Sequence, residues 1–173
     1  MSEWTAAQIT EAFAIADKLL LDRIVVNQPI YNLFERYIEK EIIPLGEKKG
    51  FGQVVFSPLA QGLLTGKYSA ADQAPSDSRA AKHENFKNKI TEGKLAKVEQ
   101  LKEIASDLNL SVAQLSLAWI LRQANVSSAL IGASRPEQVE ENVKASGIVL
   151  DNETLERITA VIDHEPVLAR SGF

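Results

Sequence analysis

The sequence predicts an α/β fold in which helices alternate with short parallel strands. Continuous runs of mostly apolar, β-branched residues occur at 23–28, 53–57 and 128–132, and each ends abruptly in polar or small residues. Between these runs the apolar residues recur every three or four positions, which is the period of amphipathic helices. Strands that are apolar on both faces and separated by helices are typical of parallel sheets covered by helices. A (β/α) barrel and a doubly wound sheet both fit this pattern.

The first helix is predicted to begin at Thr5. Thr5-Ala6-Ala7-Gln8 has the form of a capping box, in which the Thr5 hydroxyl accepts from the Gln8 amide and the Gln8 side chain reaches back. Apolar residues then recur at helical spacing as far as Leu20, which predicts about four turns. A strand over residues 24–28 follows, and Pro29 closes it.

The next unit repeats this order. Pro44 predicts the first position of a helix and Gly50 its C-terminal cap, because proline is favoured at helix starts and glycine after helix ends. The strand over residues 53–57 is ended by Pro58. Residues 69–88 are polar and lack an apolar period, which predicts a long loop of the kind that is often functional.

The last third predicts three more helices and one strand. A helix spans residues 95–108, and a second capping box, Ser111-Val112-Ala113-Gln114, begins the next one. A strand near residues 129–131 leads to a helix that begins at Pro136, and Asp151-Asn152-Glu153 caps the final helix.

Composition excludes several classes of protein. The 173 residues suit one domain, with 45% hydrophobic and 24% charged residues and a net charge of -4, so we expect no nucleic-acid partner. No run is long enough for a membrane span. The chain has no cysteine, which excludes disulfides and thiolate metal sites and fits a reducing cytoplasm. His83 and His164 lie far apart in sequence, so we expect no metal site.

Polar residues at the strand ends carry the functional signal, since functional residues of parallel α/β folds cluster there. No Gly-x-Gly-x-x-Gly follows a strand, which counts against a dinucleotide-binding doubly wound domain. Ser134 and Arg135 precede the helix at Pro136, whose free amides and dipole favour an anion. Each feature alone has an ordinary structural explanation: a helix start, a core Phe56, or solvated charges at Lys67 and Arg79. Their combination in order favours a binding site.

Three motifs occur in order along the chain: Val26-Asn27-Gln28; Phe56-Ser57-Pro58-Leu59 with Gly62 and Gly66-Lys67; and Gly132-Ala133-Ser134-Arg135-Pro136-Glu137-Gln138 with Glu141-Asn142. In these motifs the chain resembles the aldo-keto reductases, most closely the branch of potassium-channel beta subunits and bacterial relatives. The resemblance runs from residue 2 to about residue 163. It implies that residues 1–173 are the C-terminal half of a (β/α)8 TIM barrel, approximately strands six to eight with their helices, and that the first half is missing.

The resemblance also implies a site for NADP(H). Its expected residues are Ser2, Gln28, Phe56, Ser57, Leu59, Gln61, Gly62, Lys67, Arg79, Gly132, Ser134, Arg135, Gln138, Glu141 and Asn142. Gln28 would bond the nicotinamide carboxamide, the Phe56 ring would stack on the nicotinamide, and Ser2 would be the remnant of the family's serine at the end of strand five. Ser57, Leu59, Gln61 and Gly62 would line the pyrophosphate.

The remaining residues would hold the other parts of the cofactor. Lys67 and Arg79 would close a loop over it, and Ser134 and Arg135, in the motif that Gly132 opens, would hold the 2′-phosphate. Gln138, Glu141 and Asn142 would contact the adenosine.

The family reduces aldehydes and ketones with NADPH, using a tyrosine as general acid that a lysine, an aspartate and a histidine tune. These residues belong to the first half of the barrel, and Tyr31, Tyr37 and Tyr68 do not match their motif. We therefore expect no catalytic residue here and no turnover of a carbonyl substrate by the chain alone, because hydride transfer also needs a positioned proton donor.

Three parallel strands would leave two apolar edges open, whereas a closed barrel has none. Another chain could supply the missing half, or copies of this chain could associate. A third explanation is a truncation, which is favoured because Met1 falls where strand five should end. Two other functions stay open: an NADP-sensing regulatory module of the channel beta-subunit type, and a stand-alone half-barrel without a cofactor.

Overall fold

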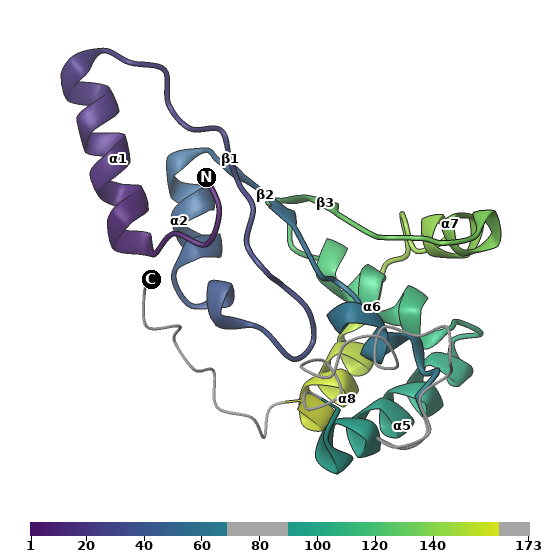
Figure 1. The fold of residues 1–173 in the computed structure, drawn as a ribbon. Helices are drawn as coiled ribbons and strands as arrows, with labels where there is room; N and C mark the ends of the chain where they lie inside the picture. The colour runs from purple at the N-terminus through teal and green to yellow at the C-terminus, as the bar shows by residue number, and fades with distance from the viewer. Residues whose placement is uncertain (69–89, 163–173) are drawn as a thin grey trace.

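The computed structural model describes residues 1–68 and 90–162 (Figure 1). Helices and short strands alternate through this part of the chain. In order they are α1 (Ala6–Leu19), β1 (Val26–Asn27), the 3₁₀ helix η1 (Tyr37–Glu39), α2 (Ile42–Lys49), β2 (Gly52–Val55), the 3₁₀ helix η2 (Ala60–Thr65), α5 (Glu92–Asp107), α6 (Val112–Leu121), β3 (Val126–Ala129), α7 (Pro136–Val143) and α8 (Asn152–Ile162).

The three strands form one parallel sheet in the order β1-β2-β3. Val26 is opposite Gly52 in the first pair, and Val55 is opposite Ala129 in the second, where the register shifts between Gln53 and Val54. An isolated parallel bridge between Ile30 and Phe56 extends the pairing of β1 and β2 beyond the regular strands. The prediction of adjacent parallel strands is therefore confirmed.

Four predicted boundaries are wrong. β1 has only two residues, β2 covers Gly52–Val55 instead of residues 53–57, and β3 ends at Ala129 instead of covering residues 129–131. Pro44 is the third residue of α2, not the first, since the helix begins at Ile42. Strand ends depend on where the partner strand ends: β2 stops at Val55, whose carbonyl accepts the Leu130 amide, and beyond this bond β3 has no partner among the described residues.

The predicted helix caps are confirmed. Both capping boxes form, with the Thr5 hydroxyl accepting from the Gln8 amide and the Ser111 hydroxyl accepting from the Gln114 amide. Gly50 ends α2 with φ 78°, a left-handed conformation that glycine adopts without steric cost. Asp151 accepts the Thr154 amide at the start of α8. Hydrogen bonds from the side chain and the backbone of Thr154 lower the pKa of the Asp151 carboxyl.

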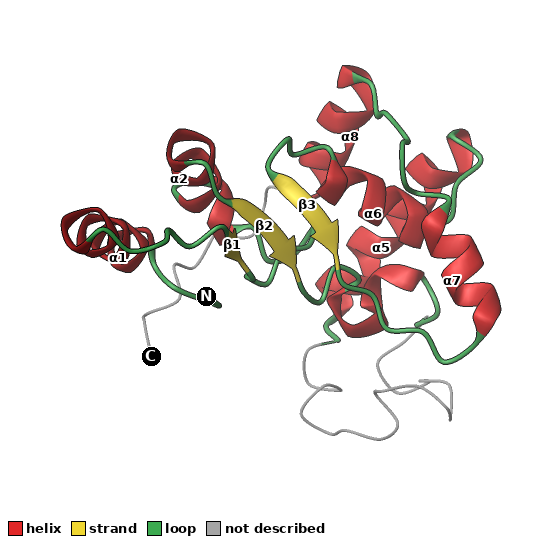
Figure 2. Cartoon of the chain, turned by 90° about the horizontal axis from the view of Figure 1, so that it is seen from above, coloured by secondary structure: helices red, strands yellow, loops and turns green. Residues whose placement is uncertain are grey.

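Helices cover one face of the sheet (Figure 2): α2 packs on β2, and α6 packs on β3. α5 and α8 pack on each other, and α5 also contacts α6. The hydrophobic core runs continuously through these elements, and α1 joins it through Phe13, whose ring lies 5.6 Å from that of Phe51. Among the described helices no single one is long and apolar enough to cross a membrane.

The N-terminal residues lie beside β1. The Met1 amino group donates to the Val26 carbonyl at 3.4 Å, and the Gln28 amide donates to the Met1 carbonyl at 2.8 Å. This alternation is how a parallel neighbour pairs with a strand. The edges still expose apolar side chains, with Val25 72% exposed beside β1 and Leu130 45% exposed after β3.

Candidate functional site

The predicted site residues follow the C-terminal ends of the three strands. Because the strands are parallel, these ends lie along one edge of the sheet (Figure 1). The structure arranges the residues in three groups, one after each strand. Arg79 lies outside the described residues.

The first group joins the N-terminus to the end of β1. The Ser2 hydroxyl donates to the Gln28 carbonyl at 2.8 Å, and the Gln28 side chain is exposed. Beyond them, the Glu3 carboxylate accepts the Ile30 amide at 2.6 Å and the Tyr37 hydroxyl at 2.9 Å. The contacts of Ser2 and Glu3 therefore hold the N-terminal residues beside the segment that follows β1.

The second group is a strained loop after β2. Of the six non-glycine residues with positive φ among the described residues, three lie here: Ser57 (51°), Ala60 (47°) and Gln61 (58°). Gly62 follows with φ 102°. Side chains with a Cβ disfavour this region, and Ser57 also precedes Pro58, which biases it toward extended backbone. Such strain persists only where the surroundings hold it, and it concentrates at functional sites.

The backbone amides of this loop differ in their hydrogen bonding. The Leu59 carbonyl accepts the amides of Gly62 and Leu64, which closes the turn. The Leu59 and Gln61 amides have no acceptor among the described residues. Amides that converge in successive turn conformations form concave sites for anions.

Lys67 lies against the same loop. A Cβ added at Gly62 would lie 3.2 Å from Lys67 Cε and 3.3 Å from Nζ, so the two residues are in close contact. The ammonium also lies 5.3 Å from the Tyr68 ring centroid. A positive charge therefore lies beside Gly62 in this loop.

The third group surrounds the start of α7. Gln138 Oε1 accepts from the Ser134 amide at 2.8 Å and from the Ser134 hydroxyl at 3.3 Å. Gly132 and Arg135 are exposed, and Arg135 makes no ion pair with the part of the chain that the structure describes. Pro136 occupies the first helical position, as predicted.

Further along α7, Glu141 is already engaged. Its carboxylate and its carbonyl both accept from the Gln114 side chain, at 3.1 and 2.9 Å, and its other carboxylate oxygen pairs with Lys144. Asn142 is half-buried. Gln138 and Glu141 thus have local structural roles in addition to any contact with a ligand.

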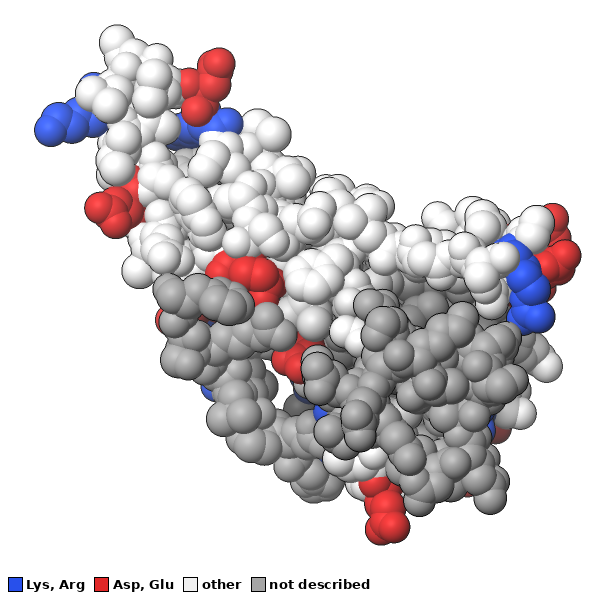
Figure 3. Space-filling model, viewed as in Figure 1, with Lys and Arg blue, Asp and Glu red and all other residues white. Residues whose placement is uncertain are grey.

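Within the described residues no hydrogen bond or ion pair joins the third group to the other two. In Figure 1 α7 lies on the far side of β3 from α1, so the predicted residues extend along the whole edge of the sheet. Figure 3 shows the same side of the molecule, where uncharged surface runs from α1 across the strands toward α7. A ligand that contacted all three groups would have to be long.

Tyr31 is the core of a polar cluster and is unsuited to acid catalysis. Its hydroxyl donates to Glu39 Oε1 at 2.5 Å and accepts from Arg122 at 3.1 Å, and its side chain is completely buried. Burial raises the pKa of Tyr31 well above its usual value. A general acid works best with a pKa near the working pH. Tyr68 is also buried, and Tyr37 donates to Glu3.

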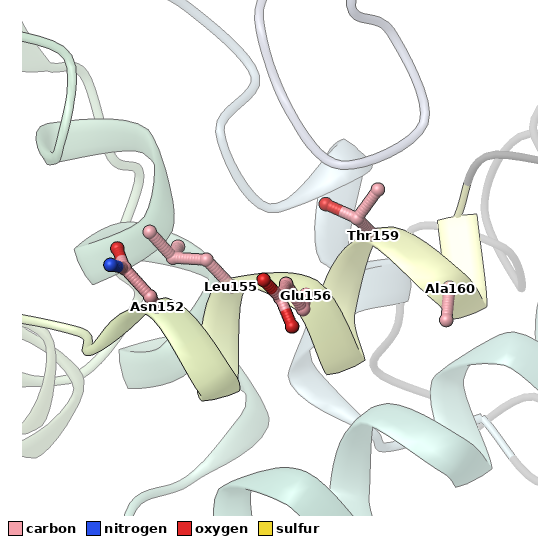
Figure 4. Close-up of a pocket in the computed structure, with 5 residues that line it drawn as sticks. All are labelled: Asn152, Leu155, Glu156, Thr159 and Ala160. Carbon is pink, nitrogen blue, oxygen red and sulfur yellow. The ribbon is translucent and has the colours of Figure 1, made fainter.

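A surface hollow on α8 is separate from these groups (Figure 4). Residues from a single face of the helix line it: Asn152, Leu155, Glu156, Thr159 and Ala160. Glu156 is the one ionisable group among them, and none of the predicted residues takes part. The hollow offers no arrangement of groups for chemistry.

One residue that the sequence analysis missed is Asn32. It lies in the loop after β1, its side chain is buried, and its Nδ2 donates to the Ser57 carbonyl at 3.0 Å. The only signal in the sequence is an asparagine after a strand end, which is common in turns.

Comparison with known proteins gives a consistent result. The family model described as "Aldo/keto reductase family" matches residues 1–163. Two proteins named "Probable voltage-gated potassium channel subunit beta", from Oryza sativa subsp. japonica and Arabidopsis thaliana, are each 45% identical over 95% of this chain and 52% of their own length. An "L-glyceraldehyde 3-phosphate reductase" of Escherichia coli (strain K12) is 41% identical over 70% of this chain and 36% of its own length. The chain thus spans about half the length of the channel-subunit relatives.

Proposed function

Because the chain belongs to the aldo/keto reductase family, we propose that it is the NADP(H)-binding half of an oxidoreductase that reduces aldehydes and ketones to alcohols. On this proposal β1, β2 and β3 are the sixth, seventh and eighth strands of a (β/α)8 barrel. Residues outside this chain complete the barrel and contribute the remaining strands.

The strained loop after β2 is the observation that carries the proposal. Its Leu59 and Gln61 amides are free among the described residues, and the Lys67 ammonium lies beside Gly62. A pyrophosphate needs donors and positive charge together, so this loop fits that part of the cofactor. Ser57 adds a hydroxyl at the same place. A side chain at position 62 would crowd Lys67, whose end would have to shift slightly, and would be strained at φ 102°.

The start of α7 fits the other end of the cofactor. Arg135 is exposed and makes no ion pair with the described residues, so its guanidinium is available for a 2′-phosphate. Ser134 adds a hydroxyl, and the first turn of the helix adds its dipole. Gln138 would contact the adenosine while it keeps Ser134 in place. Glu141 and Asn142 lie on the same helix and complete this contact.

The nicotinamide would lie at the ends of β1 and β2. The exposed side-chain amide of Gln28 can bond the carboxamide, and Ser2 beside it supports that position. Phe56 is half-buried, so part of its ring is open to stack on an aromatic ring. The bound cofactor supplies a hydride to the carbonyl carbon of the substrate.

The proton donor of the reaction would come from outside the described residues. Tyr31 is buried with a raised pKa, and its hydroxyl already bonds Glu39 and Arg122. Chain 1–173 therefore binds the cofactor and leaves the acid chemistry to the residues that complete the barrel. A reducing compartment such as the cytoplasm would suit a chain without cysteine.

The names of the plant relatives favour a second function. Both are described as potassium channel beta subunits, so this chain could belong to a protein that binds NADP(H) and reports its redox state to a partner. The two functions share the cofactor site and differ in turnover. Slow or absent carbonyl reduction by the complete protein, with tight binding of NADPH, would favour the sensor.

Calorimetric titration of the purified chain with NADPH and with NADH tests the proposal. We expect NADPH to bind at least about tenfold more tightly, because the 2′-phosphate adds charge-assisted contacts at Ser134 and Arg135. Equal affinity for the two cofactors, or tighter binding of NADH, would contradict the assignment. A chain that binds neither would contradict the proposed cofactor site itself.

A further inference from the structure

The buried side-chain amide of Asn32 connects the loop after β1 to the loop after β2. Its Oδ1 accepts the amides of Phe34 at 2.9 Å and Glu35 at 3.0 Å, and its Nδ2 donates to the Ser57 carbonyl at 3.0 Å. Backbone amides can only donate and a carbonyl can only accept, so these partners determine the orientation of the side chain. The side chain is 1% exposed, which removes competition from water.

The carbonyl that Asn32 holds belongs to the strained residue. Ser57 has φ 51° and precedes Pro58, two features that oppose each other in a relaxed chain. Its carbonyl accepts from Asn32 Nδ2 and also from the Ala60 amide at 3.0 Å. Two donors on one oxygen fix the plane of the Ser57–Pro58 peptide, and this plane sets the direction in which the loop leaves β2.

The donor itself is firmly anchored. Tyr31 and Leu33, its neighbours in sequence, are both buried. The Tyr31 ring lies 5.3 Å from the Trp119 ring, and its hydroxyl bonds Glu39 and Arg122. Asn32 therefore connects the loop after β2 to a segment that packs on Trp119 of α6.

We propose that Asn32 is a positioning residue that holds the loop of residues 57–62 in its left-handed conformation and so presents the Leu59 and Gln61 amides to an anion. The identity of that anion as a cofactor pyrophosphate rests on the proposed function. The conformational role does not, because it follows from contacts within the chain.

Replacement by alanine, Asn32→Ala, tests this role with two measurements on the full chain. Hydrogen exchange should accelerate about three- to tenfold at the amides of Ala60, Gly62 and Leu64, which is the effect of losing one neutral hydrogen bond. The affinity for NADPH should fall by a similar factor. Exchange measured without cofactor tests Asn32 even if the wild type binds no NADPH, so the two proposals fail separately.

Two further variants separate positioning from general stability. Tyr31→Phe loses its bonds to Glu39 and Arg122 but keeps Asn32 and the ring packing on Trp119 that anchors this segment. It should therefore lower the stability and leave exchange at residues 60–64 at the wild-type rate, relative to the folded population. Asn32→Asp keeps an oxygen that can accept both amides of the turn and replaces the Nδ2 donor by an acceptor, so it should reproduce the faster exchange even if Asn32→Ala does not fold. Unchanged loop exchange in Asn32→Asp, or equal acceleration in Tyr31→Phe, would overturn the proposal.

Discussion

Some residues at the candidate site are strained, and Arg135 has no ion-pair partner among the described residues. Ser57 and Gln61 adopt positive φ, a conformation that residues other than glycine largely avoid. Arg135 is exposed at the start of α7, whereas Arg23, Arg36, Arg122 and Arg157 each pair with a carboxylate. Backbone strain of this kind concentrates at functional sites, so these residues stay candidates for contact with a ligand.

Arg135→Ala should weaken NADPH binding about ten- to a hundredfold and leave NADH binding nearly unchanged, because each charge-assisted hydrogen bond contributes about 1.5–3 kcal/mol. Fluorescence or calorimetric titration of both cofactors measures the two affinities. Arg157→Ala is a control matched in charge, since Arg157 pairs with Asp107 away from α7. Equal losses for the two cofactors would show that Arg135 does not recognise the 2′-phosphate.

At the scale of elements, α2 owes its position to one glycine. Gly46 is buried where the helix crosses the start of β2, and its lack of a side chain leaves space for neighbouring polar groups. A Cβ there would lie 2.5 Å from Asn125 Nδ2 and 2.8 Å from the Phe51 carbonyl. The Asn125 side chain donates to the Ile43 carbonyl, so it cannot move without losing a bond.

Gly46→Ala should therefore lower the free energy of unfolding by about 1–3 kcal/mol, the usual cost of overpacking. Gly93→Ala in α5 is the matched control. Nothing lies within 4 Å of its added Cβ, so the higher helix propensity of alanine should raise stability by about 0.5–1 kcal/mol. Urea unfolding of both variants measures the difference. A stabilising effect of Gly46→Ala would show that α2 is not packed tightly on the sheet.

At the scale of the whole molecule, both edges of the sheet expose apolar side chains. Val25 and Leu130 are exposed on opposite sides of the sheet, and the side of the molecule in Figure 3 carries little charge across the strands. Unpaired parallel edges and exposed apolar side chains are stabilised by further strands. A second half of the barrel is the partner that the proposed function requires.

Chain 1–173 purified alone should therefore show no reduction of 4-nitrobenzaldehyde above background in the presence of NADPH, because a proton donor must be positioned beside the cofactor. Addition of the missing half as a second polypeptide should restore activity if the two assemble. Loss of NADPH absorbance gives the rate. Turnover by the chain alone that Tyr31→Phe, Tyr37→Phe or Tyr68→Phe abolishes would contradict this prediction.

Local physical chemistry made much of this protein predictable from its sequence. Capping boxes at Thr5 and Ser111, the glycine cap at Gly50 and the proline start of α7 all formed as predicted, because each depends on residues within one helical turn. The parallel order of the strands was also predictable, since short apolar runs separated by helices have few other solutions. The candidate residues came from the family resemblance that the short motifs carry, and their role in binding stays a prediction.

The tertiary structure alone decided features that depend on residues far apart in sequence. β3 ends at Ala129 because its partner β2 ends at Val55, and α2 meets the sheet where Gly46 lies close to Asn125 and the Phe51 carbonyl. The bond from Asn32 to Ser57 joins residues separated by 25 positions. No local pattern encodes such a contact, because it exists only after the two strands have paired and brought their ends to the same edge of the sheet.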